Sequence, residues 1–195
     1  MHYREIFSAL AMALTFFAFV PYIRGILRDE IRPHLFSWVI WATTTLIVFL
    51  ASLAAGAGVG AWPIGLSGTI TLGIALLAYR KSSGDRTVTR LDWFFFLAAM
   101  CALPFWYFTA DPLWAVVILT SVDLLGFGPT LRKAYHQPHE ESIPFFGIFM
   151  LRNLLVLAAL EHYSLTTVLF PATIALACLG VMGMVGYRRG RVASS

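Results

Sequence analysis

Seven apolar runs, each about as long as a bilayer is thick, limit what this sequence can fold into. About twenty helical residues span the roughly 30 Å hydrocarbon core of a membrane. The runs cover residues 5–25, 35–56, 61–80, 91–109, 112–133, 143–163 and 165–187. Only 12% of the residues are charged, whereas soluble domains carry about 25%. The sequence therefore predicts an all-α membrane protein with seven transmembrane helices and no soluble domain between them.

Basic residues give the predicted helices an orientation. All but two of the 14 Lys and Arg residues follow alternate spans, the exceptions being Arg4 and Arg152. The others are Arg24, Arg28, Arg32, Arg80, Lys81, Arg86, Arg90, Arg132, Lys133, Arg188, Arg189 and Arg191. Because basic loops stay in the cytoplasm, we expect the N-terminus outside and residues 191–195 as a cytoplasmic tail. The net charge of +4 is then explained by the anionic lipid surface, and no nucleic-acid partner is expected. The short loops favour a prokaryotic cytoplasmic (inner) membrane.

Prolines, helix-end arginines and aromatic residues recur at a constant shift of 108 positions, which is the separation of Pro129 from Pro21. Arg24 falls on Arg132 at the same shift. The further matches are Pro63 with Pro171, Tyr79 with Tyr187, Phe19 with Phe127, Trp38 with Phe146, Trp41 with Phe149 and Trp62 with Phe170. Internal repeats of this kind are typical of secondary transporters.

The repeat predicts how the spans are organised. A unit of three spans ends on the opposite side of the membrane from where it began, so a second copy joined directly would be inverted. The span at 91–109 has no partner under the shift, and its insertion restores the original direction. We therefore expect residues 1–81 and 111–190 to form two parallel triple-helix bundles, joined by a linker helix within residues 82–110.

This arrangement resembles the SWEET and PQ-loop superfamily of membrane transporters. The segments that carry the resemblance are "FAFVPYIRGILRDEIRPHLFSWVIW" and "LLGFGPTLRKAYHQPHEESIPFFGIF", and it extends over about residues 5–190. The family's Pro-Gln pair is absent, since Tyr22 follows Pro21 and Thr130 follows Pro129, so the chain looks like a bacterial-type branch. The resemblance implies a carrier that moves a small solute by alternating access through a pocket between the bundles, with Pro21 and Pro129 as hinges.

Two charged residues lie in the middle of apolar spans. Asp123 precedes Arg132 by nine residues, about 13–14 Å along a helix from the cytoplasmic end. Arg152 lies at a similar depth in the next span. A charge at the centre of a bilayer costs several kcal/mol unless it is paired or faces water. Because the two spans are joined by a short connection, we expect them to be neighbours and these side chains to pair.

The repeat extends this polar level to both bundles. Asp123 corresponds to Thr15, and Arg152 corresponds to Thr44. Asn153, which can donate and accept hydrogen bonds, corresponds to Thr45. We expect these six residues to ring a solute pocket, with Trp41 as the tryptophan best placed to reach it. Protonation of Asp123 would then couple transport to a proton gradient.

Simpler interpretations stay open. A buried Asp–Arg pair can serve only to fix two helices together, and a threonine in a membrane helix often bonds its own backbone. Glu161 and His162 form either a gate or a solvated helix end. The missing glutamines favour a second function, a non-transporting scaffold, sorting receptor or accessory subunit on the same fold.

An enzyme is not expected. The chain has no Walker loop, dinucleotide fingerprint, nucleophile elbow or zinc-protease helix. The segment "HQPHEE" fits no metal-ligand spacing, so we predict no metal and no cofactor. The expected partners are a small-molecule solute and the lipid bilayer, and a homo-oligomer stays open.

Overall fold

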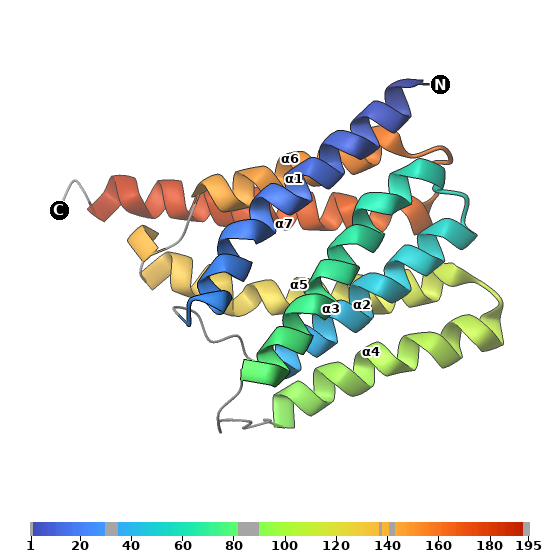
Figure 1. The fold of residues 1–195 in the computed structure, drawn as a ribbon, viewed down its shortest axis with the longest axis horizontal. Coiled ribbons are helices and arrows are strands. Elements are labelled where there is room, and N and C mark those ends of the chain that lie inside the picture. Colours follow the sequence, from blue (N-terminus) through green and yellow to red (C-terminus); the bar gives the residue numbers. More distant parts are fainter. Residues whose placement is uncertain (1, 30–34, 82–89, 137, 141–142, 193–195) are drawn as a thin grey trace.

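Helices form nearly all of the chain that the computed structural model describes, which is residues 2–29, 35–81, 90–136, 138–140 and 143–192. The α-helices are α1 (His2–Leu27), α2 (Leu35–Ala54), α3 (Trp62–Lys81), α4 (Arg90–Thr109), α5 (Pro112–His136), α6 (Ile143–Ala159) and α7 (Leu165–Val192). Two short 3-10 helices, η1 (Gly58–Ala61) and η2 (Pro138–Glu140), lie in the connections (Figure 1). These residues contain no β-strand, and the all-α prediction is confirmed.

Several helices are suited to a membrane. Four segments are long and apolar enough to cross one, namely His2–Leu27, Ser37–Ala54, Gly58–Lys81 and Leu165–Arg191. Shorter apolar segments cover Phe96–Thr109, Pro112–Leu125 and Ile143–Ala159. Large apolar side chains on their surfaces are exposed, among them Tyr107 and Phe108, each at 82%. Exposed apolar surface on this scale is unusual for a soluble monomer and indicates an integral membrane protein.

Each predicted span falls on a helix, and the span predicted at 143–163 extends furthest beyond the end of its helix. Helix α6 ends at Ala159, and residues 160–164 form a connection. The connection bonds a different part of the chain, because the backbone N–H of Glu161 donates to the carbonyl oxygen of Ala57 at 3.1 Å. An apolar sequence pattern does not record such a contact between distant connections, so it could not place this helix end.

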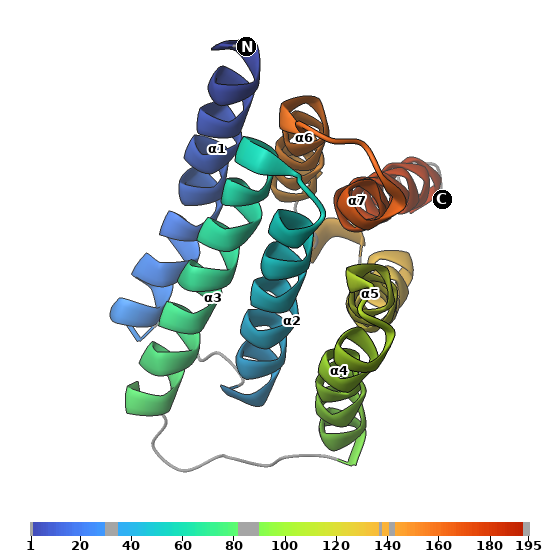
Figure 2. The ribbon, with the colours of Figure 1, turned by 90° about the vertical axis from the view of Figure 1, so that its right-hand side faces the viewer.

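Helix packing is the same in the two parts of the chain that the repeat relates. Helix α3 packs against α1 and α2, and α7 packs likewise against α5 and α6. Between the two parts, α1 packs on α6 and α2 packs on α5. The shift of 108 exchanges these two contacts, because it relates α1 to α5 and α2 to α6. Figure 2 shows α1, α3 and α2 in one group and α6, α7 and α5 in the other, with α4 beside α5.

One expectation about packing is wrong. Helices α5 and α6 were expected to be neighbours because a short connection joins them, but each packs against α7, which lies between them. A short connection limits how far apart two helix ends lie. It does not require the two helices to pack along their length. This difference changes the environment of both membrane charges.

The connection at η1 approaches the start of the α6–α7 connection closely. A Cβ atom added at Gly60 would lie 2.9 Å from the Cα and backbone nitrogen of Leu160, which is fully buried. A clash with backbone is relieved only by a shift of the chain, and overpacking of this kind costs about 1–3 kcal/mol. We therefore expect Gly60→Ala to lower the melting temperature of the purified protein.

Gly73→Ala is the matched control, because a Cβ at Gly73 in α3 meets nothing within 4 Å. That variant is expected to melt at or slightly above the native temperature, since alanine is favoured over glycine in a helix by about 1 kcal/mol. Equal melting temperatures for the two variants would contradict the close contact at η1.

Candidate functional site

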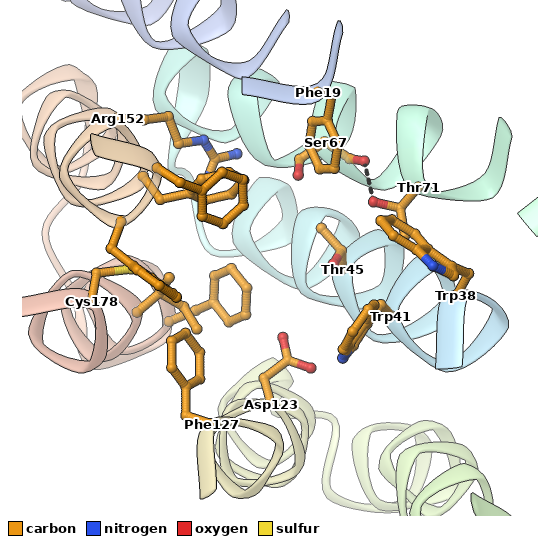
Figure 3. A pocket seen from close by; sticks show the side chains of 15 residues that line it. Phe19, Trp38, Trp41, Thr45, Ser67, Thr71, Asp123, Phe127, Arg152 and Cys178 are labelled. Carbon is orange, nitrogen blue, oxygen red and sulfur yellow. Dashed lines mark hydrogen bonds between the residues drawn. The ribbon is translucent and has the colours of Figure 1, made fainter. Parts of the chain in front are cut away.

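A cavity of about 300 Å³ lies between the two groups of helices (Figure 3). Its volume is in the range of pockets that hold small molecules. Six helices contribute to its wall, and no described side chain of α4 is among the lining residues. The lining residues are Phe19, Trp38, Trp41, Thr45, Ser67, Thr71, Asp123, Phe127, Phe145, Phe146, Phe149, Arg152, Phe170, Ile174 and Cys178.

The wall of the cavity follows the sequence repeat. Three pairs of aromatic residues related by the shift contribute both members to the lining. These pairs are Phe19 with Phe127, Trp38 with Phe146 and Trp41 with Phe149. Equivalent side chains from the two halves therefore face a common space. Binding sites at such a repeat interface are a feature of secondary transporters.

Asp123 points from α5 into this cavity (Figure 3). Its carboxylate oxygen Oδ1 lies 3.2 Å from the hydroxyl of Thr44 on α2. The same hydroxyl lies 3.1 Å from the backbone carbonyl oxygen of Trp41. A hydroxyl has one proton to donate, so Asp123 and Trp41 compete for it when the carboxylate is ionised.

Arg152 reaches the cavity from α6 and is almost completely buried, with 4% of its surface exposed. Its Nε donates to Thr15 Oγ1 at 3.2 Å and its Nη1 to Asn153 Oδ1 at 3.0 Å. Its Nη2 donates to the backbone carbonyl oxygen of Pro63 at 2.6 Å. Arg152 thus connects α6 with α1 and α3, and all three acceptors are electrically neutral.

The predicted ion pair between Asp123 and Arg152 is wrong. The ion pairs among the described residues are His2–Glu5 and Lys81–Asp29. The repeat explains why the two charges do not meet. The contact of Thr44 with Asp123 and the contact of Arg152 with Thr15 are the same contact in the two halves, because the shift relates Thr15 to Asp123 and Thr44 to Arg152. Each charge therefore faces a hydroxyl of the opposite half.

The other predicted site residues occupy two positions relative to the cavity. Thr45 and Trp41 line it, whereas Thr15, Thr44 and Asn153 bond the two charged side chains. The Thr15 hydroxyl also donates to the backbone carbonyl oxygen of Ala11 at 2.8 Å, and the Thr44 hydroxyl lies 3.1 Å from the backbone carbonyl oxygen of Trp41. Each threonine therefore contacts the backbone of its own helix, as the simpler interpretation proposed, and also contacts a charged side chain.

The predicted hinge prolines do not interrupt their helices. Pro21 lies within α1 and is exposed, and Pro129 lies within α5. The side chain of Pro129 is outside the described part of the chain. Residues that sequence reasoning missed include Ser67, Thr71 and Cys178, which come from α3 and α7. No charge or repeat match singled them out, and of the aromatic lining residues only Trp41 was expected to reach a pocket.

One end of the cavity is closed by apolar packing. One or two turns from the polar side chains, towards η1, lie Ala11, Val48, Val116, Leu119 and Val156, all with 0% exposure and all in one cluster. Beyond this layer, the backbone N–H of Val59 donates to Glu161 Oε1 at 3.1 Å. Towards the other end, the lining extends to Trp38 and Phe145, close to the starts of α2 and α6.

Glu161 is exposed, but it is more than a solvated helix end, because its carboxylate and its backbone N–H both bond the η1 connection. These bonds join the two halves at the closed end of the molecule.

No protein-family model, curated protein or solved structure matches this chain.

Proposed function

We propose that this protein is a membrane carrier that moves a small polar solute by alternating access through the cavity. In this proposal seven helices cross the membrane, and residues 1–81 and 111–190 form two parallel triple-helix bundles. The linker helix lies within residues 82–110, the N-terminus is outside and the C-terminus is cytoplasmic. The observation that carries the proposal is the pair of repeat-related polar contacts, Thr44 with Asp123 and Arg152 with Thr15, at a cavity between the halves.

Membrane energetics support this use of the two charges. Ionisable residues within membrane helices are costly and commonly mark a solute or ion pathway. Asp123 and Arg152 do not neutralise each other, and both line the cavity. A purely structural pair would gain most from direct contact, because that contact offsets the loss of hydration. Their separation is better explained by a solute that binds between them.

Alternating access requires the two halves to move apart at one end, so the bonds between them at that end must be able to break. At the closed end, such bonds join Glu161 to both Val59 and Ala57, and Arg152 to Pro63. Opening this end would break all three bonds and separate the apolar layer around Leu119. Pro21 and Pro129 each remove one backbone hydrogen bond from a helix, which makes local bending easier.

Uptake into proteoliposomes tests the carrier function. We expect saturable uptake of at least one member of a panel of labelled sugars, amino acids and related solutes. Trp41→Ala is expected to reduce this uptake strongly, because Trp41 lines the cavity. Trp114→Ala is the matched control, since Trp114 is exposed on α5 and does not line the cavity. Absence of uptake across the panel would contradict the carrier and leave the scaffold function.

Cysteine labelling tests the proposed orientation. Asp111 and His139 are exposed and lie beyond opposite ends of α5. In a Cys101→Ala background, Asp111→Cys is expected to react with a membrane-impermeant maleimide on intact cells. His139→Cys is expected to react only after the membrane is permeabilised. Reaction of both cysteines on intact cells would show that α5 does not cross the membrane in the proposed way.

A further inference from the structure

Among the described residues, the two charges of the cavity have no charged partner. Arg152 has five N–H donors, and the three bonds described for it go to a hydroxyl, an amide oxygen and a backbone carbonyl oxygen. Asp123 is bonded by one hydroxyl, through Oδ1. Both side chains point into the same cavity from different helices (Figure 3). In the described part of the chain, the cavity therefore presents a negative group and a positive group that no ion pair balances.

We infer that the solute is a zwitterion with an aromatic or apolar body. Its ammonium group binds Asp123, and its carboxylate group binds Arg152. This inference rests on the proposed function, because it assigns the substrate class of the same cavity. A solute with both charges satisfies both side chains and enters the membrane region without adding net charge. A solute with one charge leaves the other side chain without a counter-charge in a region of low dielectric.

The wall of the cavity indicates the body of the solute. Eight of the fifteen described lining side chains are Phe or Trp, and flat apolar groups gain from contact with such rings. Trp41 lies on the same side of the cavity as Asp123 in Figure 3. An aromatic ring at this place also attracts an ammonium group.

Among the described side chains, few neutral polar groups are available for a sugar. The described hydroxyls that line the cavity belong to Thr45, Ser67 and Thr71. Thr71 donates its proton to the backbone carbonyl oxygen of Ser67 at 2.7 Å. A polyhydroxylated solute needs many hydrogen-bond partners once it leaves water, and this wall supplies mainly aromatic carbon. The wall therefore favours the zwitterion over the sugar.

Four compounds with one phenyl body separate the contributions of the two charges. Phenylalanine carries both, phenethylamine only the ammonium, 3-phenylpropionate only the carboxylate, and 2-phenylethanol neither. Binding to the native protein in nanodiscs is measured by tryptophan fluorescence, with glucose as a further compound. We expect phenylalanine to bind at least about tenfold more tightly than each of the others, since each charged contact is worth about one order of magnitude.

Variants assign each charge of the compound to its side chain. Asp123→Asn is expected to remove the advantage of phenylalanine over 3-phenylpropionate. Arg152→Lys is expected to reduce the advantage of phenylalanine over phenethylamine, because lysine lacks the planar donor pair. Asp111→Asn and Arg90→Lys are the controls, since both residues are exposed and do not line the cavity. Both controls are expected to bind like the native protein.

The outcomes separate this inference from the proposed function. Equal binding of phenylalanine and the singly charged compounds, or tighter binding of glucose, would overturn the zwitterion. Saturable glucose uptake in that case would still support the carrier. Tight binding of phenylalanine without uptake of any solute would support the zwitterion site and overturn the carrier.

Discussion

Replacing Arg152 with alanine is expected to abolish solute uptake and to lower the stability of the protein. The substitution removes the donor from three acceptors, on Thr15, Asn153 and the backbone of Pro63. Hydrogen bonds from charged groups contribute about 1.5–3 kcal/mol each. We expect a total loss of about 3 kcal/mol or more, because buried acceptors remain without donors. Thermal unfolding in detergent and uptake in proteoliposomes measure the two effects.

Two further variants separate stability from transport. Arg152→Lys keeps the positive charge but cannot reproduce the fork of donors, so we expect an intermediate melting temperature and strongly reduced uptake. Arg90→Ala is the control, since Arg90 is exposed at the start of α4. Native melting and native uptake in Arg152→Ala would contradict both roles of this side chain.

The sequence was sufficient to predict the helices and the level of the polar residues. Apolar runs reveal helices because a lipid-facing helix must be apolar over its whole length. The shift of 108 predicted that Thr15, Thr44, Asp123 and Arg152 lie at one level. The structure brings these four residues together at the cavity, in two contacts. The repeat carried this information because prolines and helix-end arginines fix the register of each helix.

The partner of each charge could not be predicted from the same pattern. Connection length suggested that α5 and α6 are neighbours, and the expected pairing of Asp123 with Arg152 followed from that. The third helix of each group lies between the first and the second. Asp123 therefore contacts Thr44 on α2 in the other half. The sequence gives the depth of a side chain, whereas its lateral neighbour depends on the order of the helices.

Replacing Asp123 with asparagine is expected to make uptake insensitive to a pH difference across the membrane. In the native protein we expect such a difference to change the uptake rate several-fold, because a carboxylate that gains or loses a proton during transport couples the two movements. Asparagine has a similar shape and still accepts a hydrogen bond from Thr44, so we expect little change in melting temperature. Uptake is measured at equal and at unequal pH on the two sides.

Thr44 gives a structural reason for this coupling. When Asp123 is ionised, the hydroxyl of Thr44 donates to the carboxylate and gives up the carbonyl oxygen of Trp41. When Asp123 is protonated, its own O–H donates to Thr44, and Thr44 is free to donate to Trp41. Protonation therefore changes the contact between α2 and α5, which belong to different halves. It also removes the negative charge that the solute's ammonium group would bind.

The other titratable groups of the cavity provide the test of specificity. Arg152 and Cys178 also line it, so a response to pH that persists in Asp123→Asn would assign the coupling to one of them or to the solute. Cys178→Ser separates these cases, because serine does not titrate in the accessible range. Asp111→Asn, outside the cavity, is expected to keep the native response. Loss of the response in Asp123→Asn alone would place the coupling proton on the carboxylate that Thr44 contacts.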